Sequence, residues 1–521
     1  MAARSAIEPR GAVASLAAFF FIFTAILLLH LPLLRLPYFW DEAGYYIPAA
    51  RDFFLHHQLI PTSTLSNAHP PLPSVFLAFA WWIFGYAPIV TRIAMLVVAA
   101  AALVAVFRIA ETLAHRTVAF ATVACTALYP IWFVQSSLAH ADLLAASFTL
   151  WALACYFRER RGAAVVLFCL AALSKETALI FPLTLIAVEI ATSRSRSLRR
   201  RITAPLVLLL PLIPLAAWFG YHFLHTGFVF GNPEFLRYNV SANASPLRFL
   251  LAFAQRLWQL FGHMDMFVLT IFALIAMTWQ PLRSGSVRKP AEAERPRIAI
   301  AAQLTIASIA LANLVAFSLL GGALLTRYML PVFPLIILIF VSTLWRRWIF
   351  WRIAVAVVIA AFLFALVRGP RYRYAPEDNL AYADYVRLHE DAAHFIAAHL
   401  PHASVLTAWT GTEELNKPWL GYVPQSIKTV QIEDFSADQI MLAAQDSGAY
   451  DAAFVFSTKY DPGSPLERFR FWEKHNRQFF GYHRDLPPQA IARLLGGKVV
   501  WSEHRGVQWA AVIIFPRSMN G

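Results

Sequence analysis

The sequence contains few charged residues. Asp, Glu, Lys and Arg make up 14% of its 521 residues, whereas a soluble protein carries about 25%. Hydrophobic residues make up 59%, and the mean hydropathy is +0.55. This composition excludes an ordinary soluble protein and predicts a polytopic membrane protein.

Cysteine is also scarce. Cys125, Cys155 and Cys169 all lie within apolar runs, and no Cys-x-x-Cys pair is present. We therefore expect neither a disulfide framework nor a cysteine metal site. The first apolar run follows Arg4 and Arg10 and is too long for the core of a signal peptide. No convincing cleavage site follows it, so we interpret it as an uncleaved first helix.

The net charge of +14 does not indicate a nucleic-acid-binding protein. Its basic residues form short clusters between apolar runs, which is typical of cytoplasmic loops under the positive-inside rule. No internal repeat and no low-complexity tract is visible.

The basic clusters decide between two topologies. The run 12–36 exceeds the roughly 20 residues that cross a bilayer, but the block 72–85 is short for a span. If this block crossed, the cluster 158–161 would lie outside. If it stays at the interface, every basic cluster lies inside, and we adopt that topology. The other spans are then expected near residues 88–107, 117–136, 140–157, 202–223, 263–280, 298–320, 325–343 and 350–368. Residues 225–258, between two of these spans, are expected to form an external loop.

Residues 162–192 are flanked by basic clusters on both sides. They are too few for two full spans and too many for one, so we expect a hairpin of two short helices. Its tip would be Ser174-Lys175-Glu176, buried in protein within the outer half of the membrane. The fold class is thus a polytopic α-helical membrane protein with about 11 spans plus interfacial helices.

The composition becomes mixed and polar after Arg368. Residues 379–400 show helical spacing, and short β-rich runs follow at 404–409, 452–456, 499–501 and 507–515. We predict two domains: a transmembrane domain, 1–369, and a small extracytoplasmic α/β domain, 370–521.

Two adjacent carboxylates, Asp41 and Glu42, follow the first apolar run within the aromatic stretch 37–46. The plain alternative is an aromatic belt with two solvated acids. Further ionisable or polar candidates are expected at the same outer face, and ionisable groups near or within spans are costly enough to be functional candidates. These further candidates are His69, Arg92, Asp142, Lys175, Glu176, Arg327 and Tyr328.

Each of these residues also has a structural interpretation. Asp142 could cap the helix that follows it, and Lys175 and Glu176 could form only an ion pair with each other. Arg92 and Arg327 could be interfacial anchors, and the histidine before the Pro-Pro pair an ordinary loop residue. Their common placement at one face favours a shared site.

Transfer of a sugar from a lipid-linked phosphate suits this set. The reaction needs a carboxylate to accept the proton of an acceptor hydroxyl and cations to hold the departing phosphate. Direct attack would invert the anomeric carbon, and a monophosphate leaving group does not require a metal. We assign Asp41 as the base, His69, Arg92, Lys175 and Arg327 as cationic donors and Tyr328 as a neutral donor.

Four motifs resemble those of the dolichyl-phosphate-mannose–protein mannosyltransferase superfamily. This superfamily belongs to the GT-C glycosyltransferases and includes the aminoarabinose transferases that act on lipid A. Asp41-Glu42 with Tyr45 resembles its DExxY motif, and His69-Pro70-Pro71-Leu72 its HPPL/KPPL signature. Residues 174–177 are similar to its TKE/TKG hairpin, and 327–331 to its RYxxP element.

The resemblance implies that Asp41 is the catalytic carboxylate and that Asp142 positions or activates the acceptor. His69, Lys175 and Tyr328 match positions of the lipid-phosphate pocket. The remaining candidates are Glu42 as a further catalytic acid, Tyr45 and Glu176 as pocket residues, and Arg92 and Arg327 as phosphate ligands.

The sequence departs from the aminoarabinose branch at two places. That branch has an arginine just after Asp-Glu and has Glu-Lys before Pro-Pro, where this chain has Ala43-Gly44 and Ala68-His69. The departures weaken the expectation of lipid A modification and of the metal ligand in that branch. The His-Pro-Pro form is closer to the mannosyltransferase-like branch.

We therefore expect a membrane glycosyltransferase that moves a sugar from a polyprenyl-phosphate donor to an extracytoplasmic protein, lipid or cell-envelope glycan and requires no cofactor. The expected location is a bacterial inner membrane, with the site and residues 370–521 facing the periplasm. An ion-coupled transporter is the alternative, but Asp41 and Glu42 lie in a loop and no paired repeats are visible. A receptor that uses the external domain is a third hypothesis.

Overall fold

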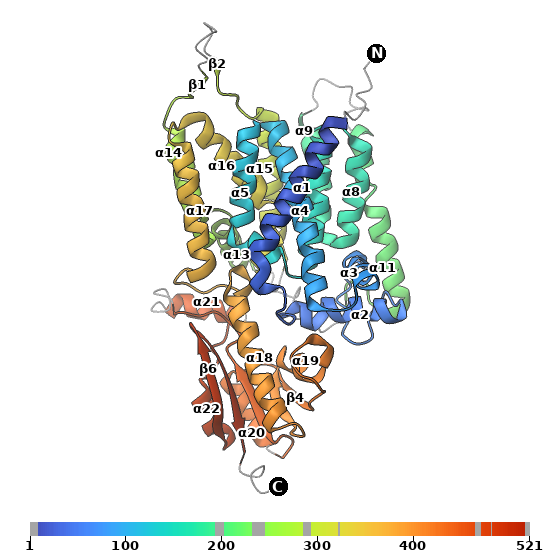
Figure 1. Cartoon of the computed structure of the whole chain (residues 1–521), viewed down its shortest axis with the longest axis vertical. Helices are drawn as coiled ribbons and strands as arrows, with labels where there is room; N and C mark the ends of the chain where they lie inside the picture. Colours follow the sequence, from blue (N-terminus) through green and yellow to red (C-terminus); the bar gives the residue numbers. More distant parts are fainter. Residues whose placement is uncertain are drawn as a thin grey trace.

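The computed structural model describes residues 9–192, 203–231, 245–284, 293–320, 324–446, 448–463, 470–480 and 482–515. A bundle of helices forms one end of the molecule and an α/β unit forms the other (Figure 1). The long apolar segments build the bundle, and the mixed polar sequence after Arg368 builds the α/β unit.

The first part of the bundle surrounds α4, a 26-residue helix that is mostly buried. Pro130 separates α5 from α6 because Tyr129, the residue before it, takes an extended backbone conformation. The elements are α1 (Pro9–His30), η1 (Leu31–Leu33), η2 (Glu42–Tyr46), α2 (Ile47–His56), α3 (Leu72–Phe84), α4 (Pro88–Leu113), α5 (Arg116–Leu128), α6 (Pro130–Gln135) and α7 (Ala141–Tyr156).

The expected hairpin is present. Helix α8 (Arg161–Ser174) leads into the short 3-10 turn η3 (Glu176–Leu179), and α9 (Ile180–Thr192) returns. Lys175 takes an extended conformation at the tip, which ends α8. The prediction of a hairpin of two short helices with Ser174-Lys175-Glu176 at its tip is therefore confirmed.

The second part of the bundle continues to Arg368. Its helices and short strands are η4 (Ala204–Leu209), α11 (Leu212–Thr226), α13 (Pro246–Phe261), η5 (His263–Asp265), α14 (Met266–Met277), β1 (Arg283–Ser284), β2 (Ala293–Glu294), α15 (Ile300–Leu319), η6 (Thr326–Met329), α16 (Phe333–Arg347) and α17 (Trp351–Arg368).

The outer surface of the bundle is apolar. Phe21 on α1 is 76% exposed and Val367 on α17 is 69% exposed, as expected of side chains that face lipid. Within the described residues, six helices are long and apolar enough to cross a membrane. The chain is an integral membrane protein; the expected number of about 11 spans stays a prediction.

Basic turns lie at one end of the bundle. The start of α1, the start of α8, which follows Arg158 and Arg160 in the chain, and the β1–β2 hairpin lie at this end, whereas α2 and α3 lie at the end that faces the α/β unit (Figure 1). Helix α3 therefore does not cross the bundle, and α4 starts from the same end. This arrangement agrees with the topology that the basic clusters favoured.

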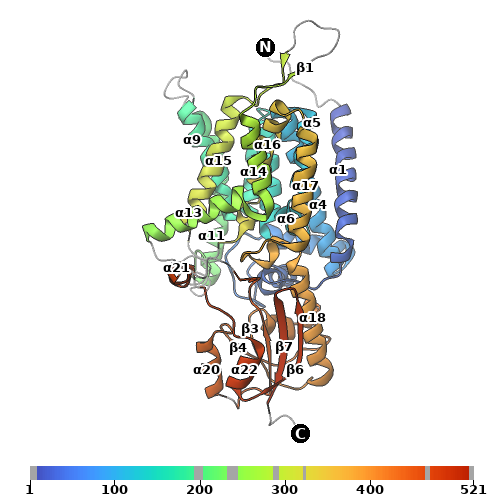
Figure 2. The ribbon, with the colours of Figure 1, turned by 90° about the vertical axis from the view of Figure 1, so that its left-hand side faces the viewer.

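One stretch differs from its prediction. Residues 225–258 were expected to form an external loop, but α13 occupies the second half of this stretch and lies across the side of the bundle (Figure 2). Its arginines, Arg248 and Arg256, are buried, while Leu250 and Trp258 are 60% and 47% exposed. The polar face points inward and the apolar face outward, as suits a helix at a lipid surface. Residues 232–244 of the expected loop lie outside the described part of the chain.

The α/β unit contains a five-stranded sheet in the order β4-β3-β5-β7-β6. Strand β3 pairs in parallel with β4 and β5, and β7 pairs antiparallel with β5 and β6. The elements are η7 (Pro376–Asp378), α18 (Ala381–His399), β3 (Val405–Ala408), α19 (Gly411–Asn416), η8 (Pro418–Leu420), β4 (Thr429–Ile432), α20 (Ala437–Gln445), β5 (Ala452–Phe456), α21 (Arg470–Phe480), α22 (Pro488–Leu495), β6 (Lys498–Arg505) and β7 (Gln508–Ile514).

The α/β unit rests on the loop between α1 and α3. The Tyr422 hydroxyl donates to the carbonyl of Tyr38 at 2.9 Å, and Lys417 Nζ donates to the carbonyl of Ser63 at 2.8 Å. The Trp409 ring covers Gly44, where an added Cβ would meet it at 2.4 Å. This packing fixes the loop that carries Asp41. The domain boundary at 369/370 stays a prediction, and the end of α17 at Arg368 supports it.

Candidate functional site

Arg327 lies at the centre of a group of charged side chains. Its Nη2 donates to Asp41 and its Nη1 donates to Glu377. Its Nε lies 3.4 Å from Oδ2 of Asp142. The Arg327 side chain is only 3% exposed, so it is not a snorkelling arginine at the membrane surface. The 3-10 turn η6 before α16 places it beneath the loop 37–46.

Lys175 extends this group from the hairpin tip. Its Nζ donates to Oδ1 of Asp142 at 2.6 Å and lies 4.3 Å from the centre of the Tyr328 ring. Asp142 thus contacts two cations and forms no side-chain cap for α7. We call Asp41, Asp142, Lys175, Arg327 and Glu377 the charged cluster. It unites four predicted site residues with one residue from the segment after α17.

Glu42 and Arg92 form a separate buried pair. The Glu42 side chain is fully buried and also accepts from the backbone N–H groups of Phe39 at 2.9 Å and Ala139 at 2.6 Å. Arg92 donates two bonds to Glu42 and one to the carbonyl of Ser137. These contacts favour a role in holding the loop on α4 over the expected catalytic and phosphate-binding roles.

His69 and Glu176 join the motif loop to the hairpin. His69 Nδ1 lies 2.9 Å from Oε2 of Glu176. Lys175 and Glu176 therefore have different partners and do not form the simple ion pair considered above. Tyr46 stacks on His69 with ring centres 6.2 Å apart, and Tyr45 packs against Trp409 at 5.7 Å.

A pocket opens beside Lys175 and Asp142. It has an empty volume of about 290 Å³ and is bounded by α7, the hairpin, α15 and η6. Its polar end holds Asp142, Lys175 and Tyr328. Its other walls are largely apolar, and we call it the lipid pocket. These walls are formed by Ala145, Ala146, Thr149, Thr177, Ala178, Phe181, Asn313, Phe317 and Pro331.

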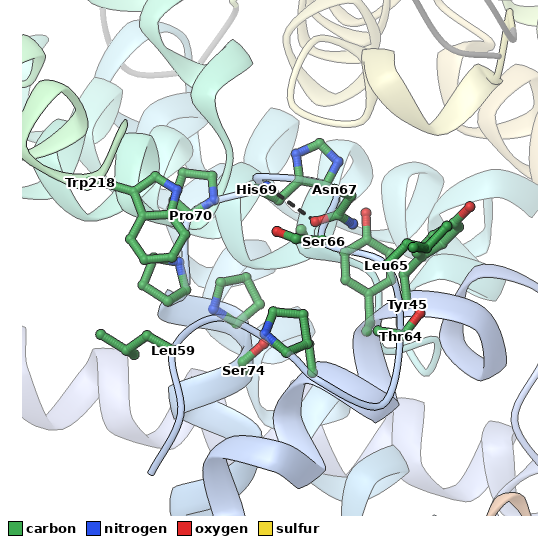
Figure 3. Close-up of a pocket in the computed structure, with 16 residues that line it drawn as sticks. Tyr45, Leu59, Thr64, Leu65, Ser66, Asn67, His69, Pro70, Ser74 and Trp218 are labelled. Atoms are coloured by element: carbon green, nitrogen blue, oxygen red, sulfur yellow. Dashed lines mark hydrogen bonds between the residues drawn. The ribbon is translucent and has the colours of Figure 1, made fainter. Parts of the chain in front are cut away.

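A second pocket of about 450 Å³ lies under the loop before α3, and we call it the loop pocket. Figure 3 shows Tyr45, Thr64, Ser66 and Asn67 around it, and the backbone N–H of His69 donating to Oδ1 of Asn67 at 3.1 Å. The residues that line it include no Asp, Glu, Lys or Arg. Tyr46, His69 and Ala141, which precedes Asp142, also line this pocket, so it adjoins the charged cluster.

The sequence did not reveal two charged residues of the site. Glu377 follows the change to polar composition, and only the folded chain brings it under Arg327. Arg256 was expected in a loop, yet its guanidinium lies 5.6 Å from the ring centres of Tyr328 and Phe317. It donates to Gln259 and to the carbonyl of Leu325 and forms no ion pair within the described residues. The inward polar face of α13 was the available signal.

Within the described residues, no group of three or more His, Cys, Asp or Glu side chains is arranged to hold a metal ion.

Comparisons with known proteins agree with the motif resemblance. Residues 68–221 match the family model of dolichyl-phosphate-mannose-protein mannosyltransferases. No curated protein matches the sequence.

Solved structures of ArnT share the fold. ArnT from Cupriavidus metallidurans bound to undecaprenyl phosphate is 15% identical, with 97% of this chain and 98% of that chain covered and a TM-score of 0.52. Apo ArnT from the same organism is 16% identical over 96% and 98% of the two chains, also with a TM-score of 0.52. The Archaeoglobus fulgidus oligosaccharyltransferase with Zn and sulfate is 12% identical over 84% and 67%, with a TM-score of 0.45.

The family match agrees with the resemblance predicted from the motifs, and the fold is that of ArnT. The chain is an integral membrane protein that is similar, over residues 68–221, to the dolichyl-phosphate-mannose-protein mannosyltransferases.

Proposed function

We propose that the chain transfers a sugar from a polyprenyl phosphate held in the lipid pocket to a hydroxyl group of an acceptor that enters from the side of the α/β unit. The observation that carries this proposal is the pocket itself: its largely apolar walls end at Lys175 and Tyr328, next to the charged cluster. An isoprenoid chain suits the walls, and an anionic phosphate suits the polar end.

Two buried cations would stabilise the negative charge of the donor phosphate. Lys175 lies at the polar end of the pocket, and the Arg256 guanidinium lies 5.6 Å from the centre of the Tyr328 ring. Preorganised cations stabilise the negative charge that develops on a departing phosphate. The Tyr328 hydroxyl is a further neutral donor. His69 pairs with Glu176, so the expected direct contact of His69 with the phosphate stays a proposal.

Asp41 is the best placed base. Its side chain is 19% exposed, whereas those of Asp142 and Glu377 are each 4% exposed. An incoming hydroxyl can therefore reach Asp41 most easily, and Arg327 orients its carboxylate. The proton of the acceptor passes to Asp41 as the acceptor oxygen attacks the anomeric carbon, and the sugar–phosphate bond breaks. This direct displacement inverts the configuration.

The loop pocket suits the hydroxyl-bearing partner. Its lining combines Tyr45 and Trp218 with the polar side chains of Thr64, Ser66 and Asn67. Such a surface hydrogen-bonds neutral hydroxyl groups and packs on apolar ring faces. It supports a sugar or a hydroxyl side chain as the acceptor group near Asp41.

The basic turns of the bundle support the orientation. Helix α8, which follows Arg158 and Arg160 in the chain, begins at the end opposite the α/β unit (Figure 1), and basic turns face the cytoplasm. The α/β unit and the site would then face outward, which in a bacterial inner membrane is the periplasm. The transporter alternative is not favoured, because Asp142 and Lys175 line a largely apolar pocket in a fold shared with ArnT.

Substitution of Asp41 tests the proposal. Purified protein in liposomes would receive a panel of polyprenyl-phosphate sugars and a cell-envelope extract, with release of free polyprenyl phosphate as the readout. We expect Asp41→Asn to lower the rate by about 100-fold or more, as for loss of a general base. Asp384→Asn, at an exposed acid on α18, is the matched control and should keep full activity. Equal rates for Asp41→Asn and the wild type would overturn the proposal.

A further inference from the structure

The charged cluster contains more acids than bases. Among the described residues, two cations, Lys175 and Arg327, contact three carboxylates, Asp41, Asp142 and Glu377. If all five were ionised, the cluster would carry one excess negative charge. An unbalanced charge in a buried region is costly unless a group takes up or releases a proton.

The surroundings of the cluster do not remove this excess. Asp378, next to Glu377, bonds to His263 at 2.8 Å and to the Thr326 hydroxyl at 3.0 Å. Arg256, a further cation nearby, donates to Gln259 and to the carbonyl of Leu325 and, among the described residues, forms no ion pair with the carboxylates of the cluster. The ion pairs of the five-residue cluster therefore leave one carboxylate in excess.

The three carboxyl groups differ in their environments. Asp41 is partly exposed, so water solvates its charge. Asp142 contacts both Lys175 and Arg327. Among the described residues, Glu377 has only Arg327 as a partner, its side chain is 4% exposed, and its buried Oε1 has no hydrogen-bond partner. The proton that would neutralise the excess negative charge is therefore most favourably placed on Glu377.

We propose that Glu377 is a protonated, neutral acid at neutral pH and acts as the positioning residue of the catalytic centre. Its carboxyl holds the guanidinium of Arg327 without adding a negative charge. Arg327 then stays directed at Asp41, which remains the ionised base, and the cluster stays open to an anionic phosphate. The segment after α17, which was assigned to the external domain, thereby contributes to the site.

The pKa of Glu377 agrees with this geometry. Burial raises it from 4.5 to about 8, although Arg327 acts in the opposite direction. Asp41, Asp378 and Asp142 add to the upward shift. At alkaline pH the ionised Glu377 would compete with Asp41 for Arg327 and repel the phosphate of the donor.

Infrared difference spectroscopy of the purified full chain tests the protonation directly. We expect the wild type at pH 7 to show a carboxylic acid C=O band that disappears as the pH rises beyond about 8. The band should be absent in Glu377→Gln and present in Asp378→Asn, the control in the same turn. A band that persists in Glu377→Gln, or its absence in the wild type, would overturn the proposal.

Isotope labelling keeps the test decisive if Glu377→Gln does not fold. In the wild type, ¹³C-labelling of glutamate carboxyls should shift the band, and labelling of aspartate carboxyls should leave it in place. The opposite pattern would assign the proton to Asp41 or Asp142 instead and contradict the role of Glu377.

The effect of Glu377 ionisation on binding of the donor lipid rests on the proposed function. Binding of undecaprenyl phosphate to the wild type should weaken by about tenfold between pH 7 and 9.5, and binding to Glu377→Gln should not change. Equal pH dependence in both proteins would contradict the positioning role. If neither protein binds the lipid at any pH, the proposed function fails, while the infrared band still decides the protonation of Glu377.

Discussion

The neighbouring carboxylates Asp41 and Glu42 have different environments. Asp41 belongs to the charged cluster and is partly exposed to solvent, whereas Glu42 is fully buried against Arg92. The sequence shows that both acids follow the first span, but it does not show which one points toward α4. Tertiary contacts with Phe39 and Ala139 make that distinction.

The Glu42–Arg92 pair should matter for stability. Arg92→Met leaves the Glu42 carboxylate buried without its cation, so we expect a loss of about 3–5 kcal/mol in the free energy of unfolding. The double variant Glu42→Gln with Arg92→Met should recover part of this loss. Thermal unfolding in detergent, followed by tryptophan fluorescence, measures both.

Arg387→Met is the matched control for that experiment. Arg387 pairs with Asp384 at 3.5 Å on the exposed face of α18, and such pairs contribute about 0–1 kcal/mol. If Arg92→Met were no more destabilising than this control, the structural role of the buried pair would be wrong.

Glu377 should give the protein a pH-dependent stability. Its pKa in the folded chain is about 8, above the ordinary value of 4.5, because burial disfavours its ionised form. Its contribution to stability is therefore fully present below pH 4.5 and is lost as the pH rises toward 8. The melting temperature of the wild type should fall relative to that of Glu377→Gln across this range, and parallel curves would contradict the raised pKa.

At the scale of elements, the site depends on short, irregular pieces. Lys175, Arg327 and Glu377 lie at a hairpin tip and in two 3-10 turns. The hairpin could be predicted because basic clusters flank a segment too short for two spans. The approach of the turn η7 to η6 could not, because no local pattern in the sequence relates Glu377 to Arg327. Helix α13 was missed because its apolar face points outward.

Gly44 tests the contact between the motif loop and the α/β unit. A methyl group there would meet the Trp409 ring at 2.4 Å, so Gly44→Ala must displace the ring or the loop. We expect a cost of about 1–3 kcal/mol and faster proteolysis of the α/β unit. Gly162→Ala is the control because its added Cβ meets nothing within 4 Å. Equal effects of the two substitutions would argue against tight docking.

The whole molecule has two chemically different ends. Composition and charge clusters were enough to predict the helical bundle, the short α3 and the later α/β unit. They could not identify the lipid pocket, because its walls come from α7, the hairpin, α15 and η6, which are far apart in the sequence.

The proposed orientation can be measured in intact cells. After replacement of the three native cysteines, a membrane-impermeant thiol reagent should label Gln425→Cys in the α/β unit. It should label Arg160→Cys, in the turn after α7, only after the membrane is opened. Both positions are exposed, so access to the reagent depends on the side of the membrane. The reverse pattern would place the site in the cytoplasm.

Binding of the donor lipid tests the central claim most directly. Native mass spectrometry of the purified protein with undecaprenyl phosphate would compare the wild type, Lys175→Ala and Tyr328→Phe. Loss of a charge-assisted bond of about 1.5–3 kcal/mol should weaken binding to Lys175→Ala by roughly 10- to 100-fold, with a smaller loss for Tyr328→Phe. Uncharged undecaprenol should bind all three proteins alike. No specific binding to the wild type, or equal binding by all three proteins, would contradict the assignment of the lipid pocket.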